Sequence, residues 1–127
     1  KLMVENNIYK ILRTREWEDA SQTGSILSEV DTKDGFIHLS TAVQLAATLS
    51  FFFKDSETVL LLQLDMDKIE MNKLIFEEPC PNDGLRKGSF PHLYSELTTD
   101  QISKMWTIER GAFSLPQEVI LQAENVT

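Results

Sequence analysis

The stretch VLLLQL, residues 59–64, constrains the fold more than any other part of this chain, because five of its six side chains are aliphatic. A short, almost continuously apolar run between polar residues is typical of a strand that is covered on both faces. The segment therefore predicts a central strand with packed elements on each side. A chain of 127 residues with 42% hydrophobic side chains can bury one such core without disulfide bonds.

Further strands are expected along the chain. Residues 8–13 alternate in character with the period of a strand, and DGFIHLS, KLIFEE and WTIERG are strand candidates as well. FPHLYS, residues 90–95, is extended. Because proline cannot donate to the hydrogen-bonding ladder, Pro91 places this segment at a sheet edge or in a loop.

Helices are predicted between these strands. In TREWEDASQTG, Thr14 can cap a short helix and Gly24 can end it. In STAVQLAATLSFFF, Thr41 and Gln44 form a potential capping box ahead of a wide apolar stripe. The same capping pattern precedes a short helix in DQISKM.

The order of the elements favours the α+β class, because strands and helices are mixed without strict βαβ alternation. Residues 25–34 show no clear period, and the tail is expected to form a short helix after Pro116. We expect residues 1–7 to be an N-terminal extension, in which Met3 is the natural start after an expression remnant. Residues 8–127 are expected to form a single α+β domain.

Charge and hydropathy exclude several classes of protein. The formal net charge is −8 and the basic residues are scattered, whereas a nucleic-acid-binding protein needs a basic face. No apolar stretch approaches the roughly 20 residues of a membrane-spanning helix, and the start has no signal-peptide pattern. We therefore expect neither a nucleic-acid partner nor a membrane location.

The single cysteine, Cys80, indicates a reducing compartment, because no intrachain disulfide can form. We expect a cytoplasmic protein. The flanking sequence EEPCPND holds no cationic side chain that would stabilise a thiolate, which argues against a nucleophilic role.

The chain has two histidines, and both stand in the pattern Phe-x-His-Leu. His38 has two interpretations: a half-buried histidine satisfied by a neighbour, or part of a polar site. In the second, Ser40 and Thr41 at the start of a helix would join the imidazole to form a receptor for an anion or polar ligand.

His92 is similarly ambiguous. Tyr94 shares its face if the segment is extended, and the two side chains could either contact a ribose or ring, or form a packing pair. Glu77 ends a strand and could orient an imidazole or act as a general base, or it could simply be solvated. Two histidines without further ligands at metal-binding spacing predict no metal site.

The segments IYKILRTREWEDA, DGFIHLSTAVQLAATLSFFF and FPHLYSEL together resemble the family called domain of unknown function 952, over roughly residues 8–110. The fold of that family is similar to the ADP-ribosyltransferase superfamily, which includes the NAD-dependent RNA 2′-phosphotransferases. The IHLS segment looks like a VHLS strand of that latter group. The resemblance implies a split antiparallel β-sheet core with a few flanking helices.

The resemblance also implies a site. Its motifs suggest that His38, Ser40 and Thr41 line the cleft where relatives bind NAD, and that His92 and Tyr94 belong to the second signature. Glu77 matches a family glutamate that usually follows tryptophan, here Phe76.

Two positions depart from the family pattern. Lys10 stands where the family commonly has a histidine, and Ser95-Glu96 stands where it commonly has Gly-Pro. The first departure removes the residue that corresponds to a nicotinamide-ribose contact in active ADP-ribosyltransferases. Lys10 could still meet a phosphate or carboxylate as a point charge.

We therefore expect a cleft around the two histidines that binds a nucleotide-like or anionic small molecule, in a monomer or weak homodimer. The predicted ligand-binding residues are Lys10, Arg13, His38, Ser40, Thr41, His92 and Tyr94. The candidates for catalysis are His38, His92 and Glu77. The alternative is an enzyme that uses NAD as cofactor, for ADP-ribosyl transfer or NAD cleavage, in the same cleft.

RNA 2′-phosphate transfer is not expected, because that chemistry requires arginines to bind the phosphate. Of the four arginines, only Arg13 lies on a strand that is expected to reach the cleft. Arg15 begins a surface helix, Arg86 lies in a long loop, and Arg110 ends the last strand candidate.

Overall fold

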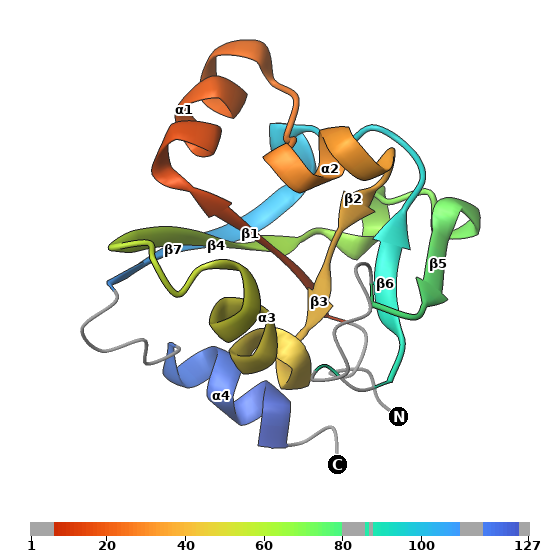
Figure 1. The fold of residues 1–127 in the computed structure, drawn as a ribbon. Helices are drawn as coiled ribbons and strands as arrows, with labels where there is room; N and C mark the ends of the chain where they lie inside the picture. Colours follow the sequence, from red (N-terminus) through yellow and green to blue (C-terminus); the bar gives the residue numbers. More distant parts are fainter. Residues whose placement is uncertain (1–6, 80–85, 87, 110–115, 125–127) are drawn as a thin grey trace.

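The structure is a computed structural model that describes residues 7–79, 86, 88–109 and 116–124 (Figure 1). The expected N-terminal extension up to residue 6, Cys80 and Arg110 lie outside the described residues. The described strands pair antiparallel in two sheets, and helices pack around them, so the class is α+β as predicted.

The larger sheet has four strands in the order β3-β1-β4-β7. Its strands are β1 (Ile8–Arg13), β3 (Ser40–Thr41), β4 (Thr58–Leu64) and β7 (Ile102–Glu109). The smaller sheet has the order β2-β6-β5. Its strands are β2 (Ile37–His38), β5 (Leu74–Glu77) and β6 (Phe90–Leu93).

Helices flank the larger sheet on both sides (Figure 1). The α-helices are α1 (Thr14–Thr23), α2 (Glu29–Asp34), α3 (Leu45–Phe52) and α4 (Gln117–Glu124). Short 3₁₀ turns are η2 (Ala42–Gln44), η3 (Met66–Lys68), η4 (Met71–Lys73) and η5 (Thr99–Gln101). None of the described helices has the length and apolar character needed to cross a bilayer.

The prediction of a central strand is confirmed, because β4 lies between β1 and β7. Leu60 and Leu62 belong to the core cluster that includes Ala20 of α1. Leu61 belongs to the other cluster, together with Leu49 of α3 and Val119 of α4. Alternate side chains of one strand thus fill two cores, which is why the sequence of β4 is apolar at nearly every position.

The predicted strand DGFIHLS is divided at Leu39. Ile37 and His38 pair with β6 in the smaller sheet, whereas Ser40 and Thr41 pair with β1 in the larger one. This segment therefore joins the two sheets, and it places His38 and Ser40 at their junction.

The prediction that Pro91 lies at a sheet edge or in a loop is wrong, because β6 is the middle strand between β2 and β5. The carbonyl oxygen of Pro91 accepts a hydrogen bond of 3.1 Å from the Leu39 N–H. The nitrogen and the carbonyl of one strand residue point to the same side. The nitrogen of Pro91, which has no hydrogen to donate, therefore faces the side of β6 on which β2 ends. The pairing of β6 with β5 on the other side is kept.

The helix expected in DQISKM is also wrong. Its predicted capping box between Thr98 and Gln101 forms, but it closes only the single turn of η5. From Ile102 the chain pairs with β4 along eight residues of strand. Tertiary pairing with the central strand overrides the local preference of this polar segment.

Two local expectations about helix boundaries need correction. Thr14 does not cap α1: Arg13 is the N-cap, and its backbone N–H donates to Glu16 Oε1 at 2.8 Å. Residues 29–34, which showed no period, form α2 with a capping box between Ser28 and Asp31. The predicted end of α1 at Gly24, the Thr41–Gln44 capping box and the helix after Pro116 are confirmed.

Candidate functional site

The two histidines lie opposite each other on neighbouring antiparallel strands. His38 of β2 is in register with His92 of β6, and the centroids of their rings are 5.5 Å apart. The ring of Phe36 packs against both, at 4.4 and 4.2 Å between centroids. Antiparallel pairing of the two Phe-x-His-Leu motifs thus brings the imidazoles together.

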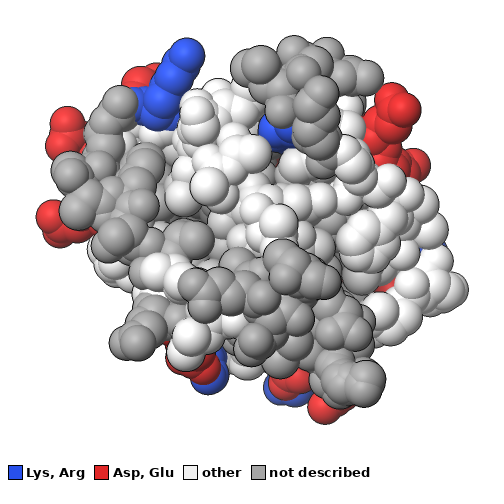
Figure 2. Space-filling view, turned by 90° about the horizontal axis from the view of Figure 1, so that it is seen from below, with Lys and Arg blue, Asp and Glu red and all other residues white. Residues whose placement is uncertain are grey.

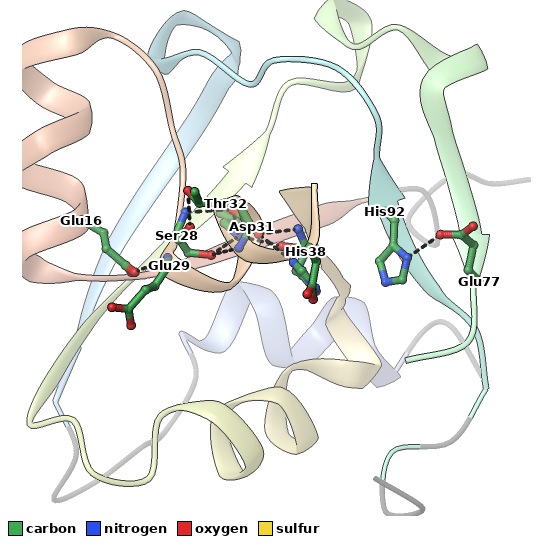
Figure 3. Close-up of polar contacts among 10 residues, drawn as sticks. Glu16, Ser28, Glu29, Asp31, Thr32, His38, Glu77 and His92 are labelled. Carbon is green, nitrogen blue, oxygen red and sulfur yellow. Dashed lines mark hydrogen bonds and ion pairs between the residues drawn. The ribbon is translucent and has the colours of Figure 1, made fainter. Parts of the chain in front are cut away.

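Both ring nitrogens of His38 contact carboxylates. Nδ1 lies 2.8 Å from Asp31 Oδ1 (Figure 3), and Nε2 lies 2.9 Å from Asp34 Oδ2. Each ring nitrogen is therefore within hydrogen-bonding distance of a carboxylate oxygen. In this arrangement the polar atoms of His38 are used within the protein, and its ring is what faces the site.

Lys10 is buried beneath α2 and binds three protein acceptors. Its Nζ lies 2.7 Å from Asp31 Oδ2, 3.0 Å from the carbonyl oxygen of His38 and 3.3 Å from Ser28 Oγ. An ammonium group has three N–H donors, so these contacts use all of them. Lys10 therefore joins β1 to α2 and β2, and the expected contact with a ligand would require it to give up one of these bonds.

The carboxylate of Asp31 is contacted by Lys10 on one side and by His38 on the other. Burial alone would raise the pKa of its carboxyl group, but the Lys10 ammonium and the hydrogen bonds from His38 outweigh it. The pKa of Asp31 is held well below its usual range, so the carboxylate is ionised at neutral pH.

His92 is oriented by a carboxylate on its other side. Glu77 Oε1 accepts hydrogen bonds from His92 Nδ1 at 2.6 Å and from Tyr94 Oη at 2.7 Å. These two hydrogen bonds lower the pKa of Glu77. Burial lowers the pKa of His92, although the hydrogen bond to Glu77 opposes it, and the nearby charge of Arg86 adds to the lowering.

These contacts define the tautomer of His92. Glu77 is ionised and can only accept, so the proton lies on Nδ1. A neutral ring then carries its lone pair on Nε2, on the side turned away from Glu77 (Figure 3). None of the described residues makes a hydrogen bond to that atom.

A cavity of about 150 Å³ lies at the junction of the two sheets and is lined by residues of β1, α2, β2, β3, α3 and β6. Its cationic lining residues are Lys10, Arg13 and Arg86, and both histidines lie on its wall. Glu29 is the only carboxylate among the described lining residues, and it is exposed. Ser40 and Thr48 also line it, and their hydroxyl oxygens are 2.8 Å apart.

Arg86 reaches this cavity, so the expectation that only Arg13 would do so is wrong. Its side chain is buried, and its guanidinium carbon lies 4.6, 4.8 and 5.1 Å from the ring centroids of Phe51, Phe52 and Phe90. Guanidinium groups bind aromatic faces by cation–π attraction, which turns a loop residue into part of the wall. Two of the rings, Phe51 and Phe52, belong to α3, far from Arg86 in the sequence, so no local pattern marked their contact with Arg86.

Not every predicted ligand-binding residue reaches the cavity. Lys10, Arg13, His38, Ser40 and His92 line it. Thr41 caps η2 instead, with its backbone N–H donating to Gln44 Oε1 at 3.0 Å. Tyr94 lines a separate hollow beside Phe36, and Glu77 stands behind His92.

Sequence reasoning missed several residues of the site. The carboxylates Asp31 and Asp34 lie in the segment without a clear period, although the spacing of Asp34 and His38 was a usable signal. The aromatic wall was missed as well: its members are Tyr9, Phe52, Phe53 and Phe90. Among the described residues, no group of three or more histidine, cysteine or acidic side chains is arranged to bind a metal ion.

Fold and site together define an α+β protein with two antiparallel sheets and a cationic cavity at their junction. Residues 11–105 match the family described as protein of unknown function (DUF952), and the chain belongs to this family.

Solved structures with this fold come from Caulobacter crescentus. The chain is similar to the crystal structure of protein CC0527, with 31% identity and a TM-score of 0.74 over 93% of this chain and 99% of that one. It is also similar to the solution structure of CC0527, with 32% identity and a TM-score of 0.65 over 84% and 86% of the two chains. No curated protein matches the chain.

Proposed function

We propose that the cavity binds a small phosphate-bearing, nucleotide-like molecule, and that the protein does not transfer phosphate groups on RNA. The observation that carries this proposal is the charge of the cavity. The cavity is lined by Arg13, by Arg86 and by Lys10, whose charge Asp31 balances, against one exposed carboxylate, in a chain whose formal net charge is −8. Such a local excess of positive charge favours a small anion.

Arg13 is suited to contact the anion. One of its guanidinium nitrogens donates to the carbonyl oxygen of Phe52 at 2.7 Å, and the group lies 4.6 Å from the ring centroid of Phe53. A guanidinium has further N–H donors in a planar fork that matches a phosphate or carboxylate. The stacking and the carbonyl contact hold the fork in place before a ligand arrives.

The size of the cavity limits what it can enclose. A cavity of similar volume in another protein accommodates one benzene ring. This cavity therefore encloses one ring or one phosphate group, and the remainder of a nucleotide-like ligand would lie outside it.

Because Arg86 also lines the cavity, the number of arginines is no longer a reason to exclude RNA as a substrate. The reason is the charge of the protein surface. On the face seen in Figure 2, the blue side chains of the described residues stand apart from one another. With a net charge of −8, a polyanion would gain little from long-range attraction.

The second candidate is an NAD-dependent enzyme with an ADP-ribosyltransferase-like fold. The pair formed by Glu77 and His92 favours it, because an ionised carboxylate at 2.6 Å from a neutral imidazole is an arrangement used in acid–base catalysis. Two separate antiparallel sheets agree with the split core of that superfamily. Release of nicotinamide from NAD by the purified protein would select this candidate.

Thermal-shift and calorimetric titrations with inorganic phosphate, AMP, ADP-ribose and NAD test the binding function. A ligand at a hundred times its dissociation constant stabilises a protein by about 2.7 kcal/mol, which such a screen detects. Arg13→Gln should weaken binding, whereas Arg15→Gln, the same charge change on an exposed neighbour, should not. Equal effects of both substitutions, or no stabilisation by any of these anions, would overturn the proposal.

RNA phosphate transfer is tested separately. Incubation of the protein with NAD and a 2′-phosphorylated RNA should leave the phosphate in place. Loss of that phosphate, abolished by His38→Ala, would contradict the proposal.

A further inference from the structure

We infer that the ligand of this cavity carries a hydroxyl group that donates a hydrogen bond to Nε2 of His92, so that the site selects a phosphorylated sugar over an unsubstituted alkyl phosphate. This inference rests on the proposed anion-binding function and names the chemical class of the ligand.

The contact with Glu77 fixes the tautomer of His92. Glu77 Oε1 lies 2.6 Å from Nδ1 and is an acceptor, so the ring proton lies between these two atoms. Nε2 is then an acceptor as well. The side chain of His92 is 3% exposed, and no described residue donates to Nε2. The wall of the cavity therefore presents an acceptor atom that a ligand filling the cavity would cover.

A fully ionised phosphate group cannot supply a donor to that atom. Its oxygens are acceptors, and next to Nε2 they would meet another lone pair. Leaving a buried acceptor unsatisfied costs more than the net gain of a typical hydrogen bond. A hydroxyl group on the same ligand resolves the conflict, because it donates to Nε2 while the phosphate binds the cationic part of the wall.

The surrounding contacts hold the imidazole in this orientation before a ligand binds. Tyr94 Oη donates to the same oxygen of Glu77 at 2.7 Å, which keeps that carboxylate at Nδ1. The ring of Phe36 packs on His92 at 4.2 Å and on Tyr94 at 5.2 Å between centroids. Preorganisation of this kind increases the discrimination that one hydrogen bond gives.

The cavity volume limits how much of a sugar phosphate is enclosed. About 150 Å³ holds one ring, so part of such a ligand would extend beyond the enclosed space. The hydroxyl groups of such a ring lie within a few bonds of the phosphate, so one molecule can contact both His92 and the cationic wall.

Two probes separate the inference from the function on which it rests. Ribose 5-phosphate and cyclopentylmethyl phosphate share the ring size and the phosphate, and only the first has hydroxyl groups. We expect calorimetry to show that ribose 5-phosphate binds about tenfold or more tightly. If both probes bind equally, anion binding stands and the inference is overturned. If neither binds, the proposed function fails and the inference fails with it.

Variants locate the preference at His92. His92→Phe keeps a ring and removes the acceptor, so the two probes should bind with similar affinity. Glu77→Ala keeps the imidazole and releases Nδ1, so the Nε2–H tautomer should grow and the preference for the hydroxylated probe should fall. Glu70→Ala, an exposed glutamate with the same charge change, is the matched control and should keep the preference.

The tautomer itself is measurable without any ligand. The chain has two histidines, so a His38 variant assigns their ¹⁵N signals. We expect His92 to carry its proton on Nδ1 in the wild-type protein. A proton on Nε2 would overturn the inference whatever the affinities.

Discussion

The Nζ atom of Lys10 lies 2.7 Å from Oδ2 of Asp31, and the two side chains are 2% and 0% exposed. This pair is the most deeply buried ionic contact among the described residues. It joins the middle of β1 to the first turn of α2, and Asp31 continues it to His38. The position of one histidine of the cavity therefore depends on a pair of charges that does not itself face solvent.

Asp31→Ala is expected to lower the free energy of unfolding by about 3–5 kcal/mol, because it leaves the Lys10 ammonium buried without a counter-charge. Urea unfolding measures the change. The matched control is the exposed ion pair of Lys104 with Glu118, where Glu118→Ala should cost less than about 1 kcal/mol. Similar losses in the two variants would contradict the buried-pair interpretation.

The double variant Lys10→Met, Asp31→Leu tests the cause of that loss. Since it removes both charges and keeps apolar volume, it should regain part of the stability that Asp31→Ala loses. A double variant that is less stable than Asp31→Ala would show that the pair contributes more than mutual compensation of charge.

Acid should unfold this protein partly through Asp31. Its pKa in the folded state lies below the ordinary value of 3.8, so the unfolded chain binds the proton more readily. The stability from this group is complete above the unfolded pKa and is lost as pH falls through the lower, folded pKa. Urea midpoints measured from about pH 6 down to pH 3 should fall less steeply in Asp31→Asn.

Local periodicity predicted those elements that are determined by residues within their own segment. The central strand, the start of α3 at its capping box and the helix after Pro116 follow from residues within each segment. Elements that depend on distant partners were not predictable in this way. The segment DQISKM becomes strand because β4 lies beside it, and DGFIHLS is divided because its two halves pair with different sheets.

The same distinction between local patterns and distant partners applies to the residues of the candidate site. The motifs, together with the family resemblance, led to the prediction that His38 and His92 share a cleft, and antiparallel pairing does place the two residues opposite each other. The motifs could not predict that the nitrogens of His38 are already bound by Asp31 and Asp34. The place of Arg86 in the site was unpredictable for another reason. Its contact with Phe51 of α3 joins residues that are far apart in the sequence, although Phe90 of β6 is a near neighbour.

His92 should titrate below the ordinary imidazole pKa of 6.5, because burial disfavours its charged form. The Cε1 proton signal in NMR spectra measures this midpoint. Since the folded pKa is lowered, stability from this group is present above pH 6.5 and is lost as pH falls through the folded pKa. Glu77→Ala should lower the midpoint further, because the Glu77 hydrogen bond favours the protonated ring. A midpoint at or above 6.5 would contradict the neutral ring on which the tautomer argument depends.

Arg86→Lys should separate charge from stacking at the cavity wall. Lysine keeps the positive charge but loses the planar group that lies within about 5 Å of the Phe51 and Phe52 rings. We expect a loss of about 1–2 kcal/mol in the free energy of unfolding, together with weaker binding of inorganic phosphate. Arg15→Lys, on the exposed surface of α1, should change neither quantity. If Arg86→Lys binds phosphate as well as the wild-type protein does, a point charge is sufficient there, and the planar guanidinium serves the packing of the three rings and not the anion.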